Sequence, residues 1–529
     1  MPNSTTHLRP WFANVLALAI SGAALTQGAD AAPPRQIAPP NDVVLQFPAS
    51  QPRSMLVQVT SMLHVAEARS QFNVDGTGLT AAVIDTGLRT THQDFVGKVV
   101  AQKNYTSDNG GDANNATDGE GHGTNVAGII CAKGIHTGMA PGAKVIPLKV
   151  LSNSGSGTFA SVVSALDWVI ANRSTYNISV VNMSLGDSGN YTSDSEFSSD
   201  AVRQRIATLR AANVAVCVAA GNDFYENSSR EGMSYPAICR ESISVGATFD
   251  ANLGRVSYYG PIAYTTAAGR ITPFSQRLHT STNSASRTDI LAPGAALTSA
   301  GIQSDQGEST AHGTSQATPV TAGLVMLAQQ YWLREKGSLP TVDQLETWLR
   351  KSKYANVDGD DEDDNVSHNQ KSYINADALE LLTAVQTDVG GSPPPPPPVN
   401  NVVAAYNTTT KTLTLTGDAA ANSVTVTYQL GSITVKGASG TTVNSNTTNF
   451  VVSVPSQINV TVNAGAGNDA VVFTGVRVGL MTVNLGDGND TLRLSYCTVS
   501  TLSLNGGDGT DAYTTVGSAV TRKYVTGVP

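Results

Sequence analysis

The chain has 529 residues, of which 40% are hydrophobic, and a formal net charge of -9 at neutral pH. This length exceeds what one hydrophobic core supports, so we expect at least two folded units. Six carboxylates lie between Asp358 and Asp364, and no cluster of Lys or Arg offers an electrostatic footprint for phosphates, so nucleic acid is not expected as a partner.

The N-terminus predicts a secretory signal peptide over residues 1–31. An apolar run from Trp11 to about Leu25 follows a basic start and precedes Ala29-Asp30-Ala31, which matches an A-x-A cleavage site. The run is too short to span a membrane, and no later stretch is long enough, so we expect no transmembrane segment. The protein is expected to be secreted, extracellular or cell-surface associated, with residues 32–62 as an N-terminal extension or short propeptide.

Residues 63–388 predict an α/β fold with a parallel sheet flanked by helices. Short apolar runs alternate there with helix-length segments such as Phe159 to Ala171 and Pro319 to Glu335. This alternation is typical of parallel sheets whose crossover connections are helices. The expected strands are Thr80 to Ile84, Lys144 to Leu151, Ser179 to Met183, Val214 to Ala219 and Ser242 to Val245.

A Gly/Ser/polyproline linker, residues 389–399, separates this domain from a different kind of sequence. Its six consecutive prolines predict an extended polyproline II spacer. Residues 400–529 then alternate Thr and Val with period two, which predicts an all-β C-terminal domain. A GxGxD repeat that begins at Gly465, Gly486 and Gly507 has a constant period of 21 residues, so we expect stacked rungs of a β-helix or β-roll.

The repeated turns resemble the calcium-binding turns of RTX-type β-rolls, although the nonapeptides of that family run back to back and these do not. Stacked rungs would place equivalent aspartates ~4.8 Å apart, where like charges repel unless an ion such as Ca²⁺ lies between them. Ordinary turns capped by Asp and Asn side chains are the other interpretation, and both stay open. The candidate structural Ca²⁺ ligands are Asp469, Asp487, Asp490, Asp508 and Asp511.

Four cysteines are too few for a disulfide scaffold in a chain of this length. Cys217 lies in an apolar run and is expected to be a buried thiol, with a Cys217–Cys239 disulfide as the alternative. The state of Cys131 and Cys497 stays open. The acidic loop 358–364 is interpreted as solvated charge, because it lacks the Gly and Glu spacing of an EF-hand.

Two motifs supply an acid and a base for nucleophilic chemistry. Asp85 follows the strand Thr80 to Ile84, and open α/β sheets place their sites at the carboxyl ends of strands. His122 stands in Gly-His-Gly-Thr before an expected helix from Thr124 to Ala132, with Gly134 as its C-cap. Both residues are candidate catalytic groups.

A third motif supplies the nucleophile. Ser315 precedes a long helix, and Pro319 is expected in the first helical turn, where its missing N–H removes no helical bond. The Ser315 N–H then faces a developing oxyanion, and the Asn222 amide is a candidate second donor. The order Asp, His, Ser is one of three known chain orders of this constellation.

Three further histidines compete with His122 for the role of base. His312 lies in a second His-Gly-Thr string, three residues before Ser315, and is interpreted as a structural or rim residue. His92 and His136 lie in loops and are expected at the surface.

On these motifs, and on longer strings such as GMAPGAKVIPLKVL and VVNMSLG, the chain from Leu63 to Leu382 resembles the subtilisin-like serine peptidases, the subtilase family. The resemblance implies a serine endopeptidase that hydrolyses peptide bonds of proteins or peptides through an acyl-enzyme, needs no catalytic cofactor and is a monomer. It places Ser234 near the floor of the substrate pocket and Asp223 at an exposed rim. The substrate-binding residues that it implies are Gly155, Ser156, Gly157, Ser184, Leu185, Gly186, Ala220 and Gly221.

The chain also departs from the family's pattern. The loop Cys131 to His136 replaces the loop that holds calcium in subtilisin, and residues 32–62 are too few for the usual inhibitory pro-domain. The repeat supports an alternative function, a calcium-dependent surface or matrix-binding protein whose peptidase domain is incidental or silent.

Overall fold

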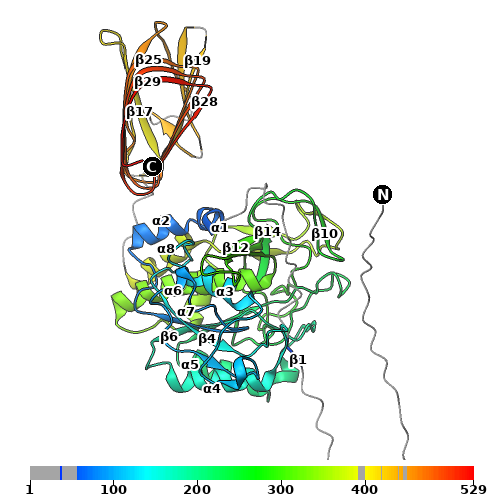
Figure 1. Ribbon diagram of the computed structural model, residues 1–529. Coiled ribbons are helices and arrows are strands. Elements are labelled where there is room, and N and C mark those ends of the chain that lie inside the picture. Colours follow the sequence, from blue (N-terminus) through cyan, green and yellow to red (C-terminus); the bar gives the residue numbers. More distant parts are fainter. Residues whose placement is uncertain are drawn as a thin grey trace, which may run out of the picture. The chain divides into compact units, whose positions relative to one another are not determined.

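The computed structural model describes residues 36–37, 56–390, 400–418, 420–429, 431–438, 440–444 and 449–528. The chain divides after Gly390 into two compact units (Figure 1). The predicted signal peptide and residues 391–399 of the predicted linker lie outside the described residues.

In the described residues of the first unit, seven strands form one sheet in the order β11-β8-β7-β6-β2-β4-β3. Every neighbouring pair is parallel, so the predicted α/β class is confirmed. Five strands begin within one residue of the expected runs, whereas β3 and β11 were not predicted. The strands are β2 (Thr80–Asp85), β3 (Lys103–Asn104), β4 (Lys144–Lys149), β6 (Ile178–Met183), β7 (Ala215–Ala219), β8 (Ile243–Phe249) and β11 (Ile290–Ala295).

Helices cover both faces of this sheet, which explains why its strands are continuous apolar runs and not alternating ones. Helices α4 and α5 pack on one face, and the long helix α6 packs on the other with α2, α3 and α8 (Figure 1). The helices are α1 (Leu56–Met62), α2 (Val65–Phe72), α3 (His122–Cys131), α4 (Phe159–Asn172), α5 (Ala201–Ala211), α6 (Thr314–Lys336), α7 (Val342–Leu349) and α8 (Ala378–Val389).

Short strands and single helical turns build the loops around the sheet. The short strands are β1 (Gln36–Ile37), β5 (Gly157–Thr158), β9 (Val256–Ser257), β10 (Ile262–Thr265), β12 (Leu297–Ala300), β13 (Glu308–Ala311), β14 (Ala355–Val357), β15 (Asp363–Asp364) and β16 (Ser372–Ile374). The 3-10 turns are η1 (Gln93–Phe95), η2 (Asn109–Gly111) and η3 (Ser195–Phe197).

Two predicted helix boundaries were wrong. Helix α3 begins at His122 itself and ends at an Ala132 cap, so Gly134 is not the C-cap. Helix α6 begins at Thr314, which places Pro319 in the second turn and not in the first. A proline in the second turn is tolerated only where the carbonyl that it leaves unpaired finds another donor.

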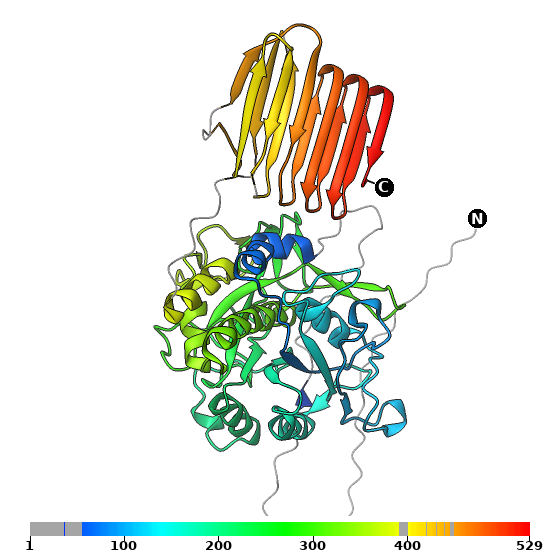
Figure 2. The same cartoon turned by 90° about the vertical axis from the view of Figure 1, so that its left-hand side faces the viewer.

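The second unit consists of two sheets, in the orders β21-β17-β18-β23-β25-β27-β29 and β22-β20-β19-β24-β26-β28. The inward side chains of both sheets share one apolar core, which includes Leu413, Val460, Phe473 and Leu504. The first strands pair as antiparallel hairpins, β17 with β18 and β19 with β20. The later strands pair in parallel at an offset of 21 residues, as in Ala470 with Thr491 and Thr491 with Ala512, so the repeat does form stacked rungs (Figure 2).

The strands of the second unit fall into the hairpin part and the rung part. The hairpin part contains β17 (Asn401–Asn407), β18 (Thr412–Thr416), β19 (Ser423–Gln429), β20 (Ser432–Gly437), β21 (Thr442–Val443) and β22 (Phe450–Ser453). The rung part contains β23 (Ile458–Asn463), β24 (Ala470–Thr474), β25 (Arg477–Asp487), β26 (Thr491–Ser495), β27 (Thr498–Asp508), β28 (Ala512–Val516) and β29 (Ala519–Thr526).

The glycines of the repeat are required by the stacking of the rungs. Gly486 and Gly507 have φ values of 98° and 96°, a region that other residues rarely adopt. A Cβ on Gly486 would overlap the carbonyl oxygen of Gly465, one rung away, and a Cβ on Gly507 would overlap that of Gly486. Close approach of the rungs therefore leaves no room for a side chain at this corner.

We expect Gly486→Ala to destabilise the second unit by more than the ~1–2 kcal/mol that an unfavourable positive φ alone costs. Gly431→Ala is the matched control, because Gly431 has φ 80° but no atom within 4 Å of its added Cβ. Hydrogen exchange of β23 to β29 in both variants measures the difference. Equal protection in the two variants would contradict the steric argument.

Candidate functional site

Asp85 and His122 meet at the carboxyl edge of the parallel sheet. Asp85 is the last residue of β2, and its Oδ1 accepts hydrogen bonds from the Thr86 N–H and from His122 Nδ1, both at 2.7 Å. Because a carboxylate only accepts, Nδ1 donates this hydrogen bond, and Nε2 is the ring nitrogen that can act as a base. Both side chains are buried, and His122 opens α3.

Ser315 lies at the start of α6 and makes two hydrogen bonds with Ser184. The Ser315 hydroxyl donates to the Ser184 carbonyl at 3.3 Å, and the Ser184 hydroxyl donates to the Ser315 carbonyl at 2.7 Å. That carbonyl would accept the helical N–H of residue 319, which is proline and has none. Ser184 therefore satisfies the group that Pro319 leaves unpaired, and it holds the first turn of α6 against the strand β6.

Asn222 is oriented by the residue before Ser315. Its Oδ1 accepts from the Thr314 N–H at 2.9 Å and from the Thr314 hydroxyl at 2.8 Å. Since the carbonyl side of the amide faces Thr314, the NH₂ side faces away from it. An Asn that follows β7 is thus fixed as a donor beside the N-terminus of α6.

Two of the predicted substrate-binding segments, at Gly186 and at Ala220, lie close together through Ser234. A Cβ on Gly186 would lie 2.7 Å from the Ser234 hydroxyl, and the Ser234 N–H donates to the Ala220 carbonyl at 2.8 Å. Gln276 fills the space behind Gly221, where a side chain would overlap its Oε1. Its Nε2 donates to the Gly189 carbonyl at 2.9 Å, and nothing in the sequence pointed to this residue.

The segment Gly155 to Gly157 ends in an edge strand that already carries a partner. Strand β5 pairs antiparallel with β1, with Ile37 opposite Gly157 and Gln36 opposite Thr158. Ile37 is only 1% exposed and belongs to the apolar cluster between the sheet and α4. This edge therefore accepts an extended chain by backbone pairing, together with an apolar side chain.

Several predictions about single residues were wrong. His92 and His136 are buried, not at the surface, and His136 Nδ1 bonds the Asp94 carboxylate at 2.7 Å. Asp223, expected to be an exposed rim carboxylate, is only 8% exposed. These errors share one cause, since burial of a loop depends on segments that are distant in sequence.

His312 is buried inside the protein, as expected of a structural residue. Its Nδ1 lies 3.0 Å from the Tyr258 hydroxyl, and burial lowers the pKa of the imidazole to about 3. All four cysteines lie in the described residues and are buried free thiols, so the alternative of a Cys217–Cys239 disulfide is wrong.

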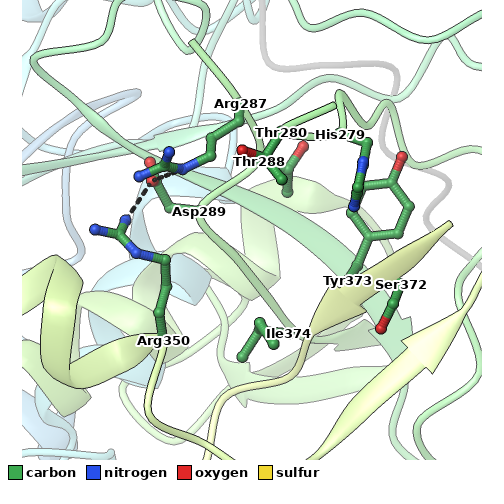
Figure 3. A pocket seen from close by; sticks show the side chains of 9 residues that line it. All are labelled: His279, Thr280, Arg287, Thr288, Asp289, Arg350, Ser372, Tyr373 and Ile374. Carbon is green, nitrogen blue, oxygen red and sulfur yellow. Dashed lines mark hydrogen bonds and ion pairs between the residues drawn. The ribbon is translucent and has the colours of Figure 1, made fainter. Parts of the chain in front are cut away.

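A cavity of about 190 Å³ lies elsewhere in the first unit (Figure 3). Arg350 and Arg287 approach the Asp289 carboxylate on one side, at 3.1 and 3.7 Å, and Tyr373 stands opposite. The lining shares no residue with Asp85, His122, Asn222 or Ser315. The two guanidinium groups are held by the same carboxylate, so this cavity has the character of a structural ion-pair site.

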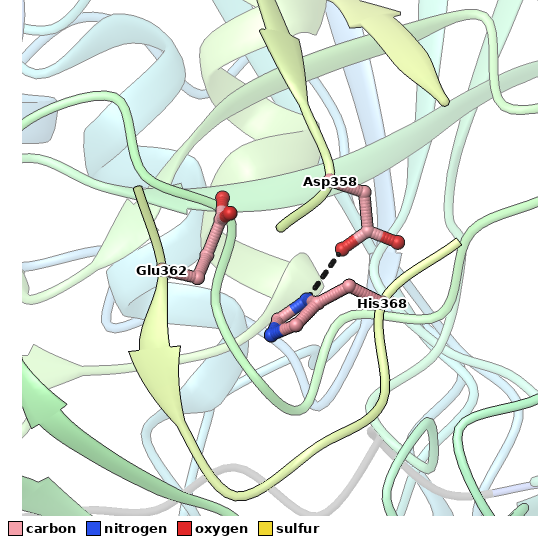
Figure 4. A group of neighbouring side chains, drawn as sticks. All are labelled: Asp358, Glu362 and His368. Carbon is pink, nitrogen blue, oxygen red and sulfur yellow. Dashed lines mark hydrogen bonds and ion pairs between the residues drawn. The ribbon is translucent and has the colours of Figure 1, made fainter. Parts of the chain in front are cut away.

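Two residues of the acidic loop, Asp358 and Glu362, form with His368 a group that resembles a metal site (Figure 4). Asp358 is buried in a bidentate ion pair with Arg277, at 3.0 and 2.7 Å, and its Oδ1 also accepts from His368 Nδ1 at 2.9 Å. Glu362 accepts from the Gly359 N–H at 2.7 Å. Because a guanidinium and N–H donors occupy these oxygens, we interpret the group as an ion-pair network, although it is not the uniformly solvated charge that we expected.

The repeat aspartates fall into two environments. Asp469, Asp490 and Asp511 are buried, whereas Asp487 is exposed, and the Asp508 side chain lies outside the described residues. The Asp469 N–H donates to Asp490 Oδ1 at 2.7 Å, and the Asp490 N–H donates to Asp511 Oδ1 at 2.9 Å. Each Oδ2 of the three is buried without a hydrogen-bond partner among the described residues.

Burial therefore raises the pKa of Asp469 to about 7, and the neighbouring Asp490 carboxylate adds to the shift. Asp490 has its pKa raised by burial as well. With raised pKa values, the stacked carboxylates of Asp469 and Asp490 hold either protons or a cation.

His368 should make stability depend on pH. Hydrogen bonds to Asp358 and Asp364 raise its pKa from 6.5 to about 10. A histidine whose pKa is raised by folding stabilises the folded state fully when the pH lies below its pKa in the unfolded chain. This stabilisation declines as the pH rises through its pKa in the folded protein. We expect His368→Gln to lower the midpoint of urea unfolding at pH 6. This difference in midpoint from the wild type should disappear above pH ~10. His279→Gln, which removes a histidine outside this network, is the control, and a gap independent of pH would contradict the assignment.

Comparison with known proteins identifies the family of the first unit. Residues 76–373, more than half of the chain, match the model of the subtilase family, peptidase S8. Alkaline serine protease ver112 of Corniculantispora psalliotae is 34% identical over 274 residues, which are 50% of this chain and 59% of that protein. Alkaline serine exoprotease A of Vibrio alginolyticus is 35% identical over 268 residues, 50% of this chain and 40% of that protein.

The major intracellular serine protease of Bacillus subtilis (strain 168) is 30% identical over 262 residues, 49% of this chain and 70% of that protein. The chain spans about half the length of the first curated relatives it matches. The matched residues include Asp85, His122, Asn222 and Ser315. Because the family model matches most of the first unit, the chain belongs to the subtilase family of peptidases.

Proposed function

We propose that the protein is a serine endopeptidase in which Ser315 is the nucleophile, His122 the base and Asp85 its orienting carboxylate. The observation that carries the proposal is the hydrogen bond between Asp85 and His122 Nδ1 at 2.7 Å, which leaves Nε2 basic at the edge of the sheet where α6 begins. A free serine hydroxyl is a poor nucleophile and needs such a base.

In the first half-reaction, Ser315 Oγ attacks the peptide carbonyl and its proton passes to His122 Nε2. Asp85 stabilises the imidazolium that forms and does not itself take the proton. His122 then gives the proton to the leaving amine as the C–N bond breaks, which leaves an acyl-enzyme. Water, deprotonated by the same base, releases the second product, and no catalytic cofactor takes part.

The oxyanion of each tetrahedral intermediate is assigned to Asn222 and to the Ser315 N–H. The orientation of the Asn222 amide by Thr314, at 2.9 and 2.8 Å, supports this role, because a fixed donor needs no reorganisation during the reaction. The N-terminus of α6 adds its partial positive charge beside the same oxygen.

The substrate is proposed to bind as an added strand between Gly155 to Gly157 and Ser184 to Gly186. Backbone pairing of this kind gives affinity with modest side-chain selectivity. The antiparallel pairing of β5 with Gln36 and Ile37 supports it, since the edge already accepts an extended segment. Ala220 and Gly221 would then wall the pocket for the residue before the cleaved bond, with Ser234 at its floor.

The organisation proposed for the whole chain has a signal peptide over 1–31, an extension over 32–62, the peptidase domain over 63–388, a linker over 389–399 and the repeat domain over 400–529. One relative, from a Thermus strain, is named an extracellular serine proteinase, and secretion is proposed here on the sequence of the first 31 residues. None of the described helices is long and apolar enough to cross a membrane.

Calcium binding by the repeat is a second candidate activity. The unbonded Oδ2 atoms of Asp469, Asp490 and Asp511 favour it, because a hard cation would supply the partner that the protein lacks there. On this proposal the second unit is a calcium-dependent domain that attaches the peptidase to a surface or matrix.

Replacement of Ser315 by Ala is expected to lower turnover of casein about 10⁶-fold, the loss known for subtilisin, a member of this family. Replacement of Asn222 by Ala should cost about 10²- to 10³-fold, because one oxyanion donor is lost. Ser284→Ala removes an exposed hydroxyl and is the control. Labelling by a fluorophosphonate probe should depend on Ser315, and a Ser315→Ala variant that still cleaved casein would refute the assignment.

Calcium is expected to raise the unfolding temperature of the second unit, measured by calorimetry on the full chain with Ser315→Ala to prevent self-cleavage. The shift should vanish in EGTA and in Asp490→Asn, which keeps the size of the side chain but removes its charge. Asp361→Asn, an exposed carboxylate of the first unit, should keep the shift. An unfolding temperature that does not change with calcium would favour the other interpretation, in which the turns are capped by side chains and the carboxyls are protonated.

A further inference from the structure

Asn125 lies in the first turn of α3, three residues after His122, and is only 2% exposed. Both ends of its side-chain amide make hydrogen bonds. Nδ2 donates to the Ser309 carbonyl at 2.9 Å and to the Ser309 hydroxyl at 3.0 Å, and Oδ1 accepts from Gln316 Nε2 at 3.4 Å. Bonds at both ends fix which way the amide faces. No step of the proposed mechanism uses this residue.

The partners of Asn125 lie on both sides of the nucleophile in the sequence. Ser309 belongs to β13, which leads through Gly313 into α6, and Gln316 directly follows Ser315. Gln316 is fully buried, so solvent does not compete for its amide. The helix that carries the base is thereby tied to the segment before the nucleophile and to the residue after it.

A separate set of contacts holds α3 on the side of Asp85. The Gly123 N–H donates to the Thr86 hydroxyl at 2.8 Å, and a Cβ on Gly123 would lie 2.4 Å from the Gly87 carbonyl oxygen. These contacts press the start of α3 against the end of β2. Thr86 therefore connects the base with its orienting carboxylate, whereas Asn125 connects the base with the nucleophile.

We propose that Asn125 is a positioning residue that sets the separation between His122 Nε2 and Ser315 Oγ. It acts through its bonds to Ser309 and Gln316, and the inference rests on the proposed endopeptidase function. Proton transfer requires the two atoms to lie within hydrogen-bond reach, and a misplacement of ~1 Å costs up to about 100-fold in rate. Because the bonds of Asn125 tie α3 to the segment that carries Ser315, their loss should loosen this separation.

The proposed substrate-binding edges do not depend on Asn125. Among the described residues, none of its hydrogen bonds reaches Gly155 to Gly157 or Ser184 to Gly186. A variant that loses these bonds should therefore bind substrate as before and carry out the chemical step more slowly. Its kcat should fall while its KM stays nearly unchanged.

The test measures kcat and KM for two variants. Asn125→Leu keeps the approximate size of the side chain and removes all three bonds, and Gln316→Met removes only the longest of them. We expect kcat to fall about 10- to 100-fold in the first variant and about 3- to 10-fold in the second. In the Asn125→Leu background, Gln316→Met should have little further effect, because the bond between the two residues is already lost.

Gln329→Met is the matched control. Gln329 lies on the same helix as Gln316, is equally buried and also donates one hydrogen bond from Nε2, to the Ser179 carbonyl of β6 at 2.9 Å. Among the described residues it makes no hydrogen bond with α3. This control should lower the unfolding temperature but keep kcat. Calorimetry in a Ser315→Ala background, which prevents self-cleavage, measures the unfolding temperature of each variant.

Dependence on His122 separates positioning from a purely structural role. A His122→Ala variant keeps a residual turnover that comes from the oxyanion donors and from substrate binding. Addition of Asn125→Leu should change this residual turnover by less than about twofold, because no base remains to be placed.

Cleavage by the wild type that Ser315→Ala abolishes establishes the endopeptidase independently of Asn125. With that activity present, wild-type kcat in folded Asn125→Leu would overturn the inference, as would wild-type kcat in Gln316→Met should Asn125→Leu fail to fold. A loss of equal size in the His122→Ala background or in Gln329→Met would also overturn it, since the effect would not pass through the base. Absence of all cleavage would refute the proposed function itself.

Discussion

The first turn of α6 is the constraint on which the rest of the first unit depends. A helix that starts inside a protein exposes N–H groups and, here, a carbonyl that Pro319 leaves without its helical partner. Ser184 from the end of β6 bonds that carbonyl, and Asn222 from the end of β7 accepts from Thr314. Two strand ends are thereby held against one helix N-terminus, and the polar groups that satisfy the helix are the ones that surround Ser315.

The second unit depends on a different constraint, the close stacking of equivalent turns of the 21-residue repeat. Glycines such as Gly486 let one rung approach the carbonyl of the next, and the buried aspartates bridge rungs through N–H to Oδ1 bonds at 2.7–2.9 Å. The same stacking leaves one oxygen of each carboxylate unbonded. A repeat selected for tight packing thus creates a column of buried acid, which a proton or a cation must neutralise.

The sequence predicted those features that depend on neighbours along the chain. Continuous apolar runs indicated the buried parallel strands, and the 21-residue period indicated the rungs. It failed where burial or pairing comes from distant segments, as at His92, His136 and Asp223. The two hydrogen bonds between Ser184 and Ser315 were missed too. A proline four residues after Ser315 was a signal that the Ser315 carbonyl needs another donor.

By itself, then, the sequence determined the order of Asp85, His122 and Ser315, the class of both units and the period of the repeat, because motif, apolar pattern and period are local properties. Only the tertiary structure decided that Asp85 holds His122 by Nδ1, that Gln276 packs behind Gly221, and that Asp223 is buried beside Asn222. The first two bring together residues that are distant in the sequence, and their contacts follow from how the strand ends converge at one edge of the sheet.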